Sequence, residues 1–200
     1  MASVKLEIVQ AGNPILRQRA RPLSATEIRS REIQKLIETM RTCMHEAPGV
    51  GLAAPQLGLP LQLAVIEDRE EYHKDVSPEL LRERERNPVA FHAVINPTIQ
   101  LIGEETAEFF EGCLSLAGFT ALVSRARAVR VTCLNERAEA KVIDATGWYA
   151  RILQHEIDHL NGTLYIDRMR TRSFTSMDNL AEFWKGRPVA EIKSELDLKD

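Results

Sequence analysis

Hydrophobic residues recur at helical intervals in three segments of the chain. Residues 24–47 begin with Ser24 and Glu27 at capping-box spacing and continue with apolar positions, namely Ile33, Leu36, Ile37, Met40 and Met44. Residues 147–162 form the most hydrophobic segment and end at Gly162, with apolar positions at Trp148, Ile152, Leu153, Ile157 and Leu160. Residues 173–186 repeat the spacing at Phe174, Met177, Leu180 and Phe183 or Trp184. The pattern predicts an amino-terminal helix, a buried central helix and a carboxy-terminal helix.

Between these segments the pattern changes to short β-rich runs. "LQLAVIE" (61–67) and "FHAVINP" (91–97) predict strands, and the charged stretch 67–88 between them predicts a solvated insertion. Several further runs from 98 to 146 are separated by Gly, Asn and Glu, as expected for antiparallel strands joined by turns. We expect one α+β domain over residues 1–200, with antiparallel β-sheets packed around the buried central helix.

Composition excludes several classes of protein. The formal net charge of -3 provides no broad cationic surface for nucleic acid, and no apolar run is long enough to cross a membrane. Cys43, Cys113 and Cys133 are few and odd in number, which favours free thiols in a reducing compartment. No targeting segment is evident at the amino terminus, so we expect a cytoplasmic protein, or an organellar one if a transit segment has been removed.

The central helix carries the motif "QHEIDH" (154–159). His155 and His159 lie one turn apart on the same helix face, where both imidazoles can bind one cation. Glu156 can then act as the acid-base residue of a metal-dependent hydrolase. Catalytic sites of this kind usually have three protein ligands and one open position, so a third ligand is needed.

The residues alone leave the third ligand open. Tyr165 occupies the position of a third histidine in the metzincin pattern, which excludes that class. Glu182 is the candidate in a peptidase, and Cys113 in "EGCLS" (111–115) is the candidate in a Cys-His-His site. A non-catalytic zinc module would need a fourth ligand, for which only ordinary histidines remain: His45, His73 and His92.

Three stretches together resemble one family. "GVGLAAPQ" (49–56), "EGCLS" and "QHEIDH" are similar, in order and approximate spacing, to the signature motifs of the peptide deformylases. "GNPILR" (12–17) and "FHAVINP" also resemble segments of that family, so the resemblance covers most of the chain. It implies a metallohydrolase that removes the formyl group from the initiator methionine of new polypeptides and releases formate.

The resemblance also implies roles for individual residues. Cys113, His155 and His159 become the ligands of one divalent ion, most often Fe²⁺ in this family, with Zn²⁺, Ni²⁺ or Co²⁺ as substitutes. Glu156 becomes the acid-base residue, while the Gln56 amide and the Leu114 N–H become donors to the oxyanion. Glu111 and Arg125 are expected to form a supporting ion pair. The implied substrate-binding residues are Val50, Gly51, Phe109, Gly112, Trp148 and Ile152.

Some features depart from the common bacterial pattern. Ala117 stands where many members have proline, the 67–88 insertion is long, and "GWYARI" precedes the ligand helix. These features resemble the mitochondrial-type subclass. The expected partners are N-formylmethionyl peptides, with the ribosome exit region as a further candidate. Residues 182–200 are not basic overall, so docking of this tail to RNA is not expected.

Overall fold

The computed structural model describes residues 7–74 and 76–198. Its strands form one antiparallel sheet in the order β1-β2-β3-β4-β5, with β6 beside β4. The strands are Gly51–Ala53 (β1), Leu63–Asp68 (β2), Val89–Gly112 (β3), Phe119–Leu134 (β4), Ala140–Thr146 (β5) and Thr175–Ser176 (β6). The α-helices are Ala25–Ile28 (α1), Arg31–Glu46 (α2), Pro78–Glu83 (α3), Gly147–Leu160 (α4), Met177–Asn179 (α5) and Val189–Glu195 (α6). Short 3-10 helices span Pro14–Arg17, Ala54–Leu57, Glu70–His73, Tyr165–Asp167 and Thr171–Ser173, and a π-helix spans Leu180–Trp184.

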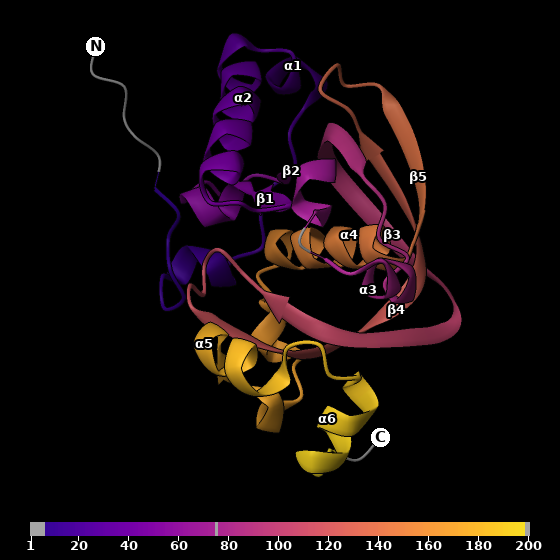
Figure 1. Ribbon diagram of the computed structural model, residues 1–200. Helices are drawn as coiled ribbons and strands as arrows, with labels where there is room; N and C mark the ends of the chain where they lie inside the picture. The colour runs from indigo at the N-terminus through magenta and orange to yellow at the C-terminus, as the bar shows by residue number, and fades with distance from the viewer. Residues whose placement is uncertain (1–6, 75, 199–200) are drawn as a thin grey trace.

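Helix α4 lies in the middle of the molecule, and the sheet curves around it (Figure 1). Ala150, Leu153 and Leu160 on this helix are almost fully buried. The helix ends where Gly162 adopts a φ of +75°, and a Cβ there would lie 2.7 Å from the Arg17 carbonyl oxygen. Glycine is therefore required at that position both by conformation and by the close approach of the chain. The predicted α+β arrangement around a buried central helix is confirmed.

The other predicted helices differ from the expectation in their boundaries. The Ser24–Glu27 capping box forms, but it caps only α1, and Ser30 caps a separate helix α2. A second cap so close to the first ends one helix and begins another. At the carboxy terminus, the predicted helix is a short α-helix followed by the π-helix, and the polar tail forms α6 with Ile192 buried.

The antiparallel strands predicted between residues 98 and 146 are confirmed as β3, β4 and β5, but β3 and β4 are long rather than short. β3 continues through Gly103, where the register against β4 shifts between Ile102 and Thr106. Gly103 has a φ of +72°, so the irregularity bends the strand without ending it. Residues 89–95 of β3 pair with β2, and residues 95–112 pair with β4, so the two pairings meet at Ile95. The β3–β4 hairpin thus extends below α4, towards the carboxy-terminal helices (Figure 1).

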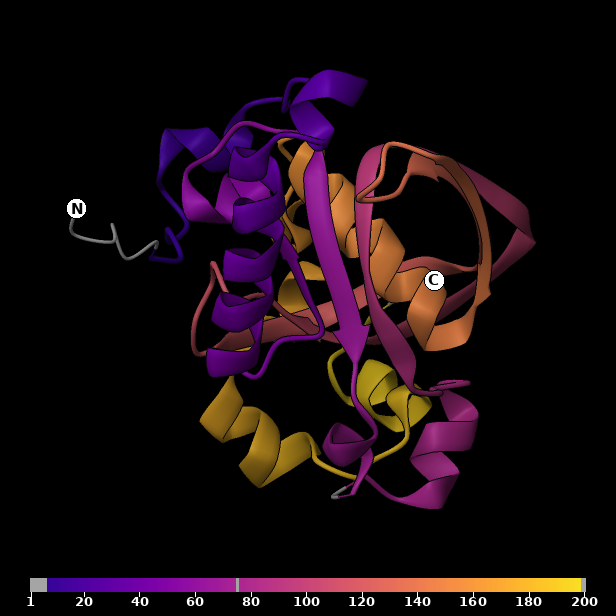
Figure 2. The ribbon, with the colours of Figure 1, turned by 90° about the horizontal axis from the view of Figure 1, so that it is seen from above.

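The charged insertion is solvated over most of its length, as predicted, since none of its described residues from 69 to 88 is buried, but it is anchored at its ends, which was not predicted. Asp68 is 1% exposed, and its carboxylate accepts two hydrogen bonds from the Arg86 guanidinium, at 2.7 and 2.8 Å. The 3-10 helix Glu70–His73 and helix α3 lie between these ends. Burial of both charges is tolerated because each one neutralises the other and satisfies its hydrogen bonds. Figure 2 shows α3 on the same side of the molecule as the carboxy-terminal helices.

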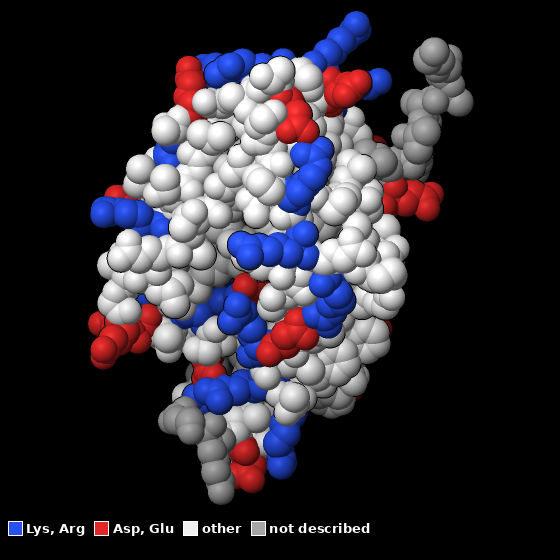
Figure 3. Space-filling view, turned by 180° about the vertical axis from the view of Figure 1, so that it is seen from behind, with Lys and Arg blue, Asp and Glu red and all other residues white. Residues whose placement is uncertain are grey.

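The surface carries charges of both signs. On the face in Figure 3, Lys and Arg side chains form a broken line over the middle of the molecule, with Asp and Glu among them. The formal net charge of the whole sequence is -3. Among the described residues, no helix is both long and apolar enough to cross a bilayer.

The packing of the insertion against α4 yields a stability prediction. A Cβ on Gly147, whose φ is +57°, would lie 2.4 Å from the Glu85 Cβ, whereas a Cβ on Gly103 would meet nothing within 4 Å. We expect Gly103→Ala to lose about 1–2 kcal/mol of unfolding free energy through its positive φ alone. Gly147→Ala should lose roughly 2–5 kcal/mol, because overpacking is added to the same conformational cost. Urea denaturation checks this, and equal losses in the two variants would contradict the tight packing at Gly147.

Candidate metal centre and substrate cleft

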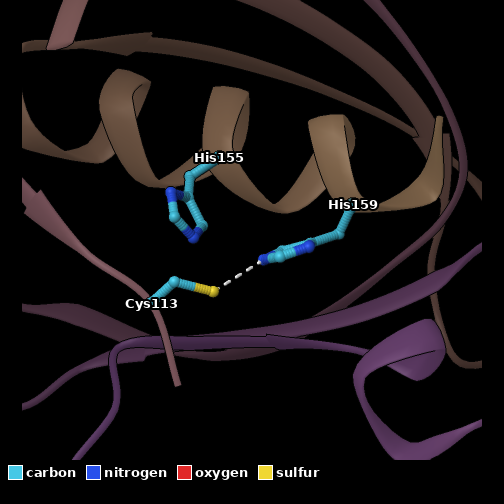
Figure 4. A group of neighbouring side chains, drawn as sticks. All are labelled: Cys113, His155 and His159. Carbon is cyan, nitrogen blue, oxygen red and sulfur yellow. Dashed lines mark hydrogen bonds between the residues drawn. The ribbon is translucent and has the colours of Figure 1, made fainter. Parts of the chain in front are cut away.

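Cys113 lies just after β3 and faces two histidines of α4. Its Sγ lies 3.2 Å from the Nε2 of His159, and the ligand atoms of Cys113, His155 and His159 lie within 4.8 Å of one another. Figure 4 shows the three side chains converging from the strand end and from successive turns of the helix. The two imidazoles converge because residues four apart share a helix face. Glu182, the alternative third ligand, is exposed in the π-helix and lies outside this group.

The donor set fits a divalent transition metal. One sulfur and two imidazole nitrogens are the ligands that such ions take in catalytic sites with three protein ligands. The Nδ1 of His155 lies 3.0 Å from a Glu111 carboxylate oxygen, which orients the ring and leaves its Nε2 for an ion. His159 is 1% exposed, and its Nδ1 has no hydrogen-bond partner among the described residues. Burial and the neighbouring His155 lower the pKa of His159, which favours the neutral imidazole that metal binding requires.

Within the described part of the chain, no fourth His, Cys, Asp or Glu joins this group. The remaining histidines have other partners: His45 pairs with Glu67, His73 lies near Asp68, and His92 lies 2.9 Å from the Tyr149 hydroxyl. The arrangement therefore matches an open site, and it provides no support for a closed structural zinc module.

The Gln56 side chain is held with its amide nitrogen towards Cys113. Gln56 lies in the 3-10 helix Ala54–Leu57 and is 2% exposed. Its Oε1 accepts a hydrogen bond from the Ala53 N–H at 2.9 Å, and its Nε2 lies 3.3 Å from the Ser115 Oγ and 3.5 Å from the Cys113 Sγ. Because the oxygen is already occupied, the amide can present only its N–H groups to the site.

Glu156 is buried beside the metal ligands. One of its carboxylate oxygens, Oε2, has no hydrogen-bond partner among the described residues. Burial raises the pKa of Glu156 to about 7. A Cβ on Gly51 would lie 2.3 Å from the other oxygen, Oε1, so only glycine leaves room for this carboxylate. A buried carboxyl group of raised pKa, next to an open metal position, is suited to taking up and returning a proton.

A buried ionic network surrounds the ligand helix. Glu111 forms the predicted ion pair with Arg125, through hydrogen bonds of 2.9 and 3.0 Å, and Arg151 donates to it at 2.6 Å. Arg125 also donates to Asp158 on α4. Burial opposes ionisation of Glu111, but the hydrogen bonds from His155 and Arg125 outweigh it and hold its pKa well below the usual range.

Sequence reasoning missed Arg151 and Asp158 as members of this network. Arg151 lies one turn before His155, and Asp158 lies inside the "QHEIDH" motif. Both are buried, at 4% and 8% exposure. Their presence in the most hydrophobic helix could have indicated buried ion pairs, since charged residues are rarely buried without partners.

A cavity of about 670 Å³ opens in front of these residues. Of the predicted substrate-binding residues, those that line it are Val50, Gly51, Gly112, Trp148 and Ile152. The structure corrects the prediction for Phe109, which is 8% exposed and packs against Trp148 with ring centroids 6.1 Å apart. Phe110 lines the cavity instead, because consecutive residues of a strand point to opposite faces. Met177, at the start of α5, is a further wall residue that the sequence did not indicate.

Comparisons with known proteins agree with this site. The family model described as polypeptide deformylase matches residues 5–174. "Peptide deformylase 1A, chloroplastic" from Solanum lycopersicum is 48% identical over 174 residues, and the match covers 87% of this chain and 63% of that protein. "Peptide deformylase 1A, chloroplastic/mitochondrial" from Arabidopsis thaliana is 45% identical over 174 residues, covering 87% of this chain and 65% of that protein.

Solved structures show the same relationship. A crystal structure of class I type b peptide deformylase from Acinetobacter baumannii, with Met-Ala-Ser bound, superposes with a TM-score of 0.74 at 33% sequence identity. The match covers 84% of this chain and 100% of that one. The chain thus spans just under two thirds of the two plant relatives and the whole of a bacterial relative. With the three motifs gathered at one metal-binding cleft, this chain belongs to the polypeptide deformylase family.

Proposed function

We propose that this protein removes the N-formyl group from the amino-terminal methionine of new polypeptides and releases formate. The observation that carries the proposal is the convergence of Cys113, His155 and His159 beside the buried carboxylate of Glu156. A peptidase that uses Glu182 lacks this support, because Glu182 is exposed and outside the ligand group. The family match and the cleft in front of the three ligands support the same activity.

Cys113, His155 and His159 would hold one divalent ion, for which we propose Fe²⁺, with Zn²⁺, Ni²⁺ or Co²⁺ able to replace it. When bound, such an ion lowers the pKa of a coordinated water, to about 7 in favourable sites, and polarises the formyl carbonyl. The protein supplies the remaining elements of catalysis. Glu111 orients the His155 ring, and the N–H of Ser115 lies 3.4 Å from the Cys113 sulfur, so both ligands are positioned before substrate arrives.

The proton transfers fall to Glu156. Its buried carboxylate accepts a proton from the attacking water and then donates it to the α-amine that leaves, so one group serves both steps. Charge that develops on the formyl oxygen meets the Gln56 amide and the N–H of Leu114. Leu114 lines the cleft, and its N–H takes part in none of the hydrogen bonds found among the described residues. Donors held in place beforehand stabilise such charge without reorganisation, each by roughly 2.7–4 kcal/mol.

The cleft suits a substrate that is defined by its first residue. Trp148 and Ile152 provide apolar walls for the methionine side chain, together with Val50. Gly51 and Gly112 border the same cleft and can offer backbone groups to an extended peptide, as in strand addition. Backbone recognition with one side-chain pocket allows many sequences to follow the methionine.

The partners and location that we propose remain those expected from the sequence. N-formylmethionyl peptides are the substrates, and the ribosome exit region is a candidate site of encounter. We propose a cytoplasmic or organellar location. The names of the two plant relatives place those proteins in chloroplasts or mitochondria, which supports the organellar alternative.

Replacement of Cys113 separates the deformylase from the peptidase. We expect the wild type to contain about one divalent ion per chain, to stop releasing formate from formyl-Met-Ala-Ser after chelation, and to recover with Fe²⁺. Cys113→Ala should lose the ion and the activity, whereas Cys43→Ala, on α2, should keep both. Metal analysis after anaerobic purification, combined with a formate assay, makes the measurement. Full metal content in Cys113→Ala would exclude this ligand set.

Glu156→Gln tests the acid-base role. The amide keeps the shape of the side chain but cannot take up the proton, so kcat should fall by about 10²- to 10⁴-fold. Metal content should stay at the wild-type level, because Glu156 is not one of the three ligands. Steady-state kinetics and metal analysis on the same sample decide the matter, and a variant that keeps more than a tenth of wild-type kcat would refute the role.

Gly51→Ala tests the space that Glu156 needs. The new methyl group would lie 2.3 Å from the Glu156 Oε1, so the carboxylate must move. We expect kcat to fall by at least about tenfold, since small displacements of a catalytic group are costly. The bound metal and the far-ultraviolet circular dichroism should remain unchanged. An alanine variant with wild-type kcat would show that Glu156 does not act from the position seen here.

A further inference from the structure

A second cavity lies beside the substrate cleft. It has a volume of about 660 Å³ and lies between α3 in the charged insertion and the carboxy-terminal helices. Phe110 and Met177 line both cavities, so the two spaces share a wall. Most of its lining is apolar, with contributions from Leu80, Phe109, Leu180, Trp184, Val189 and Ile192.

One cation at this cavity has no ion-pair partner in the described part of the chain. Arg84, at the end of α3, lines the cavity. Its guanidinium carbon, Cζ, lies 4.7 Å from the centroid of the Trp148 ring and 5.4 Å from that of the Phe109 ring. Its Nε is buried without a hydrogen-bond partner, and none of the ion pairs among the described residues includes it. Burial, with the nearby charges of Arg86 and Arg151, lowers the pKa of Arg84 to about 10, so it is still charged at neutral pH.

The other charged groups near the cavity form no ion pair with Arg84 among the residues that the structure describes. Arg86 and Arg151 are already paired, with Asp68 and Glu111 respectively. Glu79 pairs with Arg82 at the surface. Glu83, the residue before Arg84, also lines the cavity and is exposed. Its charge favours the charged form of Arg84, but it forms no ion pair with Arg84 among the described residues.

Lys185 adds a second cation to the lining and has no ion-pair partner among those residues, whereas Arg187 pairs with Glu195. The cavity therefore combines apolar walls with an excess of positive charge, because Arg84 and Lys185 face one exposed carboxylate, Glu83, that is paired with neither among the described residues. An anionic group that carries an aliphatic stem complements both properties.

We propose that this second cavity receives the part of the polypeptide substrate that follows the first residues, and that Arg84 selects an acidic side chain there. The inference rests on the proposed function, because it extends the substrate cleft. An extended peptide advances about 3.3–3.6 Å per residue, so a chain that leaves the cleft past Phe110 and Met177 enters the second cavity within a few residues. Its aliphatic groups would pack on the apolar walls, and its carboxylate would pair with the Arg84 guanidinium.

The test compares matched peptides. Formyl-Met-Ala-Ser is extended with alanines to eight residues, and a single Glu or Gln is placed at each position from the fourth to the seventh. At one or two positions, the wild type should show a kcat/KM for the Glu peptide about three- to tenfold above that for the Gln peptide, mainly through KM. The ratio should approach one at high salt, because the ion pair is only partly buried.

Variants assign the preference to one side chain. Arg84→Gln should bring the Glu/Gln ratio to about one, and Arg84→Lys should keep part of it. Arg82→Gln is the matched control on the same helix, since the Arg82 side chain is 75% exposed and its ion pair among the described residues is with Glu79, at the surface. This control should keep the wild-type ratio. If loss of Arg84 disturbs Trp148, both peptides are affected equally, so the Glu/Gln ratio of kcat/KM does not change for that reason.

The proposal is overturned if the wild-type ratio is one at every position, or if it survives in Arg84→Gln. Should Arg84→Gln fail to fold, persistence of the wild-type ratio at high salt overturns it instead. Absence of formate from the unextended formyl-Met-Ala-Ser would reject the proposed function. In that case calorimetry with the unformylated Glu and Gln peptides still decides whether the cavity prefers the acid.

Discussion

The buried carboxylate of Glu111 is the interaction on which the site depends. It accepts hydrogen bonds from Arg125 on β4 and Arg151 on α4, and it orients His155 on the same helix. A charge buried at 5% exposure is tolerated only when such partners surround it, so the strand end, the neighbouring strand and the helix must adopt one relative position. Cys113 follows Glu111 by two residues and is thereby placed opposite the two histidines.

The curvature of the sheet creates the cleft in front of the ligand group. The bend in β3 near Gly103 lets the β3–β4 hairpin pass beneath α4, which brings Cys113 under the histidines and Phe110 to the wall of the cavity. On the other side, Gly51 of β1 lies very close to α4. The Glu156 carboxylate occupies the space that a side chain at position 51 would need. Ligands, carboxylate and cleft therefore arise from the packing of two sheet regions on one helix.

The insertion and the carboxy-terminal segment both line the second cavity. Arg86 anchors the insertion to Asp68, and Arg84 stacks on Trp148, a wall of the substrate cleft. The carboxy-terminal helices close the opposite side of the second cavity, with Ile192 buried. The long insertion is solvated, as its composition indicated, and it also contacts the cleft in front of the candidate metal centre through Arg84 and Trp148.

The sequence by itself determined the central helix, the pair of histidines one turn apart and the neighbouring Glu156, because helical periodicity places residues four apart on one face. It also identified Cys113 and Gln56, through motifs that resemble those of a known family. Only the tertiary structure decided that β3 runs unbroken through Gly103, that Phe110 rather than Phe109 lines the cleft, and that Arg151 and Asp158 join the buried network. These features depend on register and on contacts between residues distant in sequence, which local patterns do not encode.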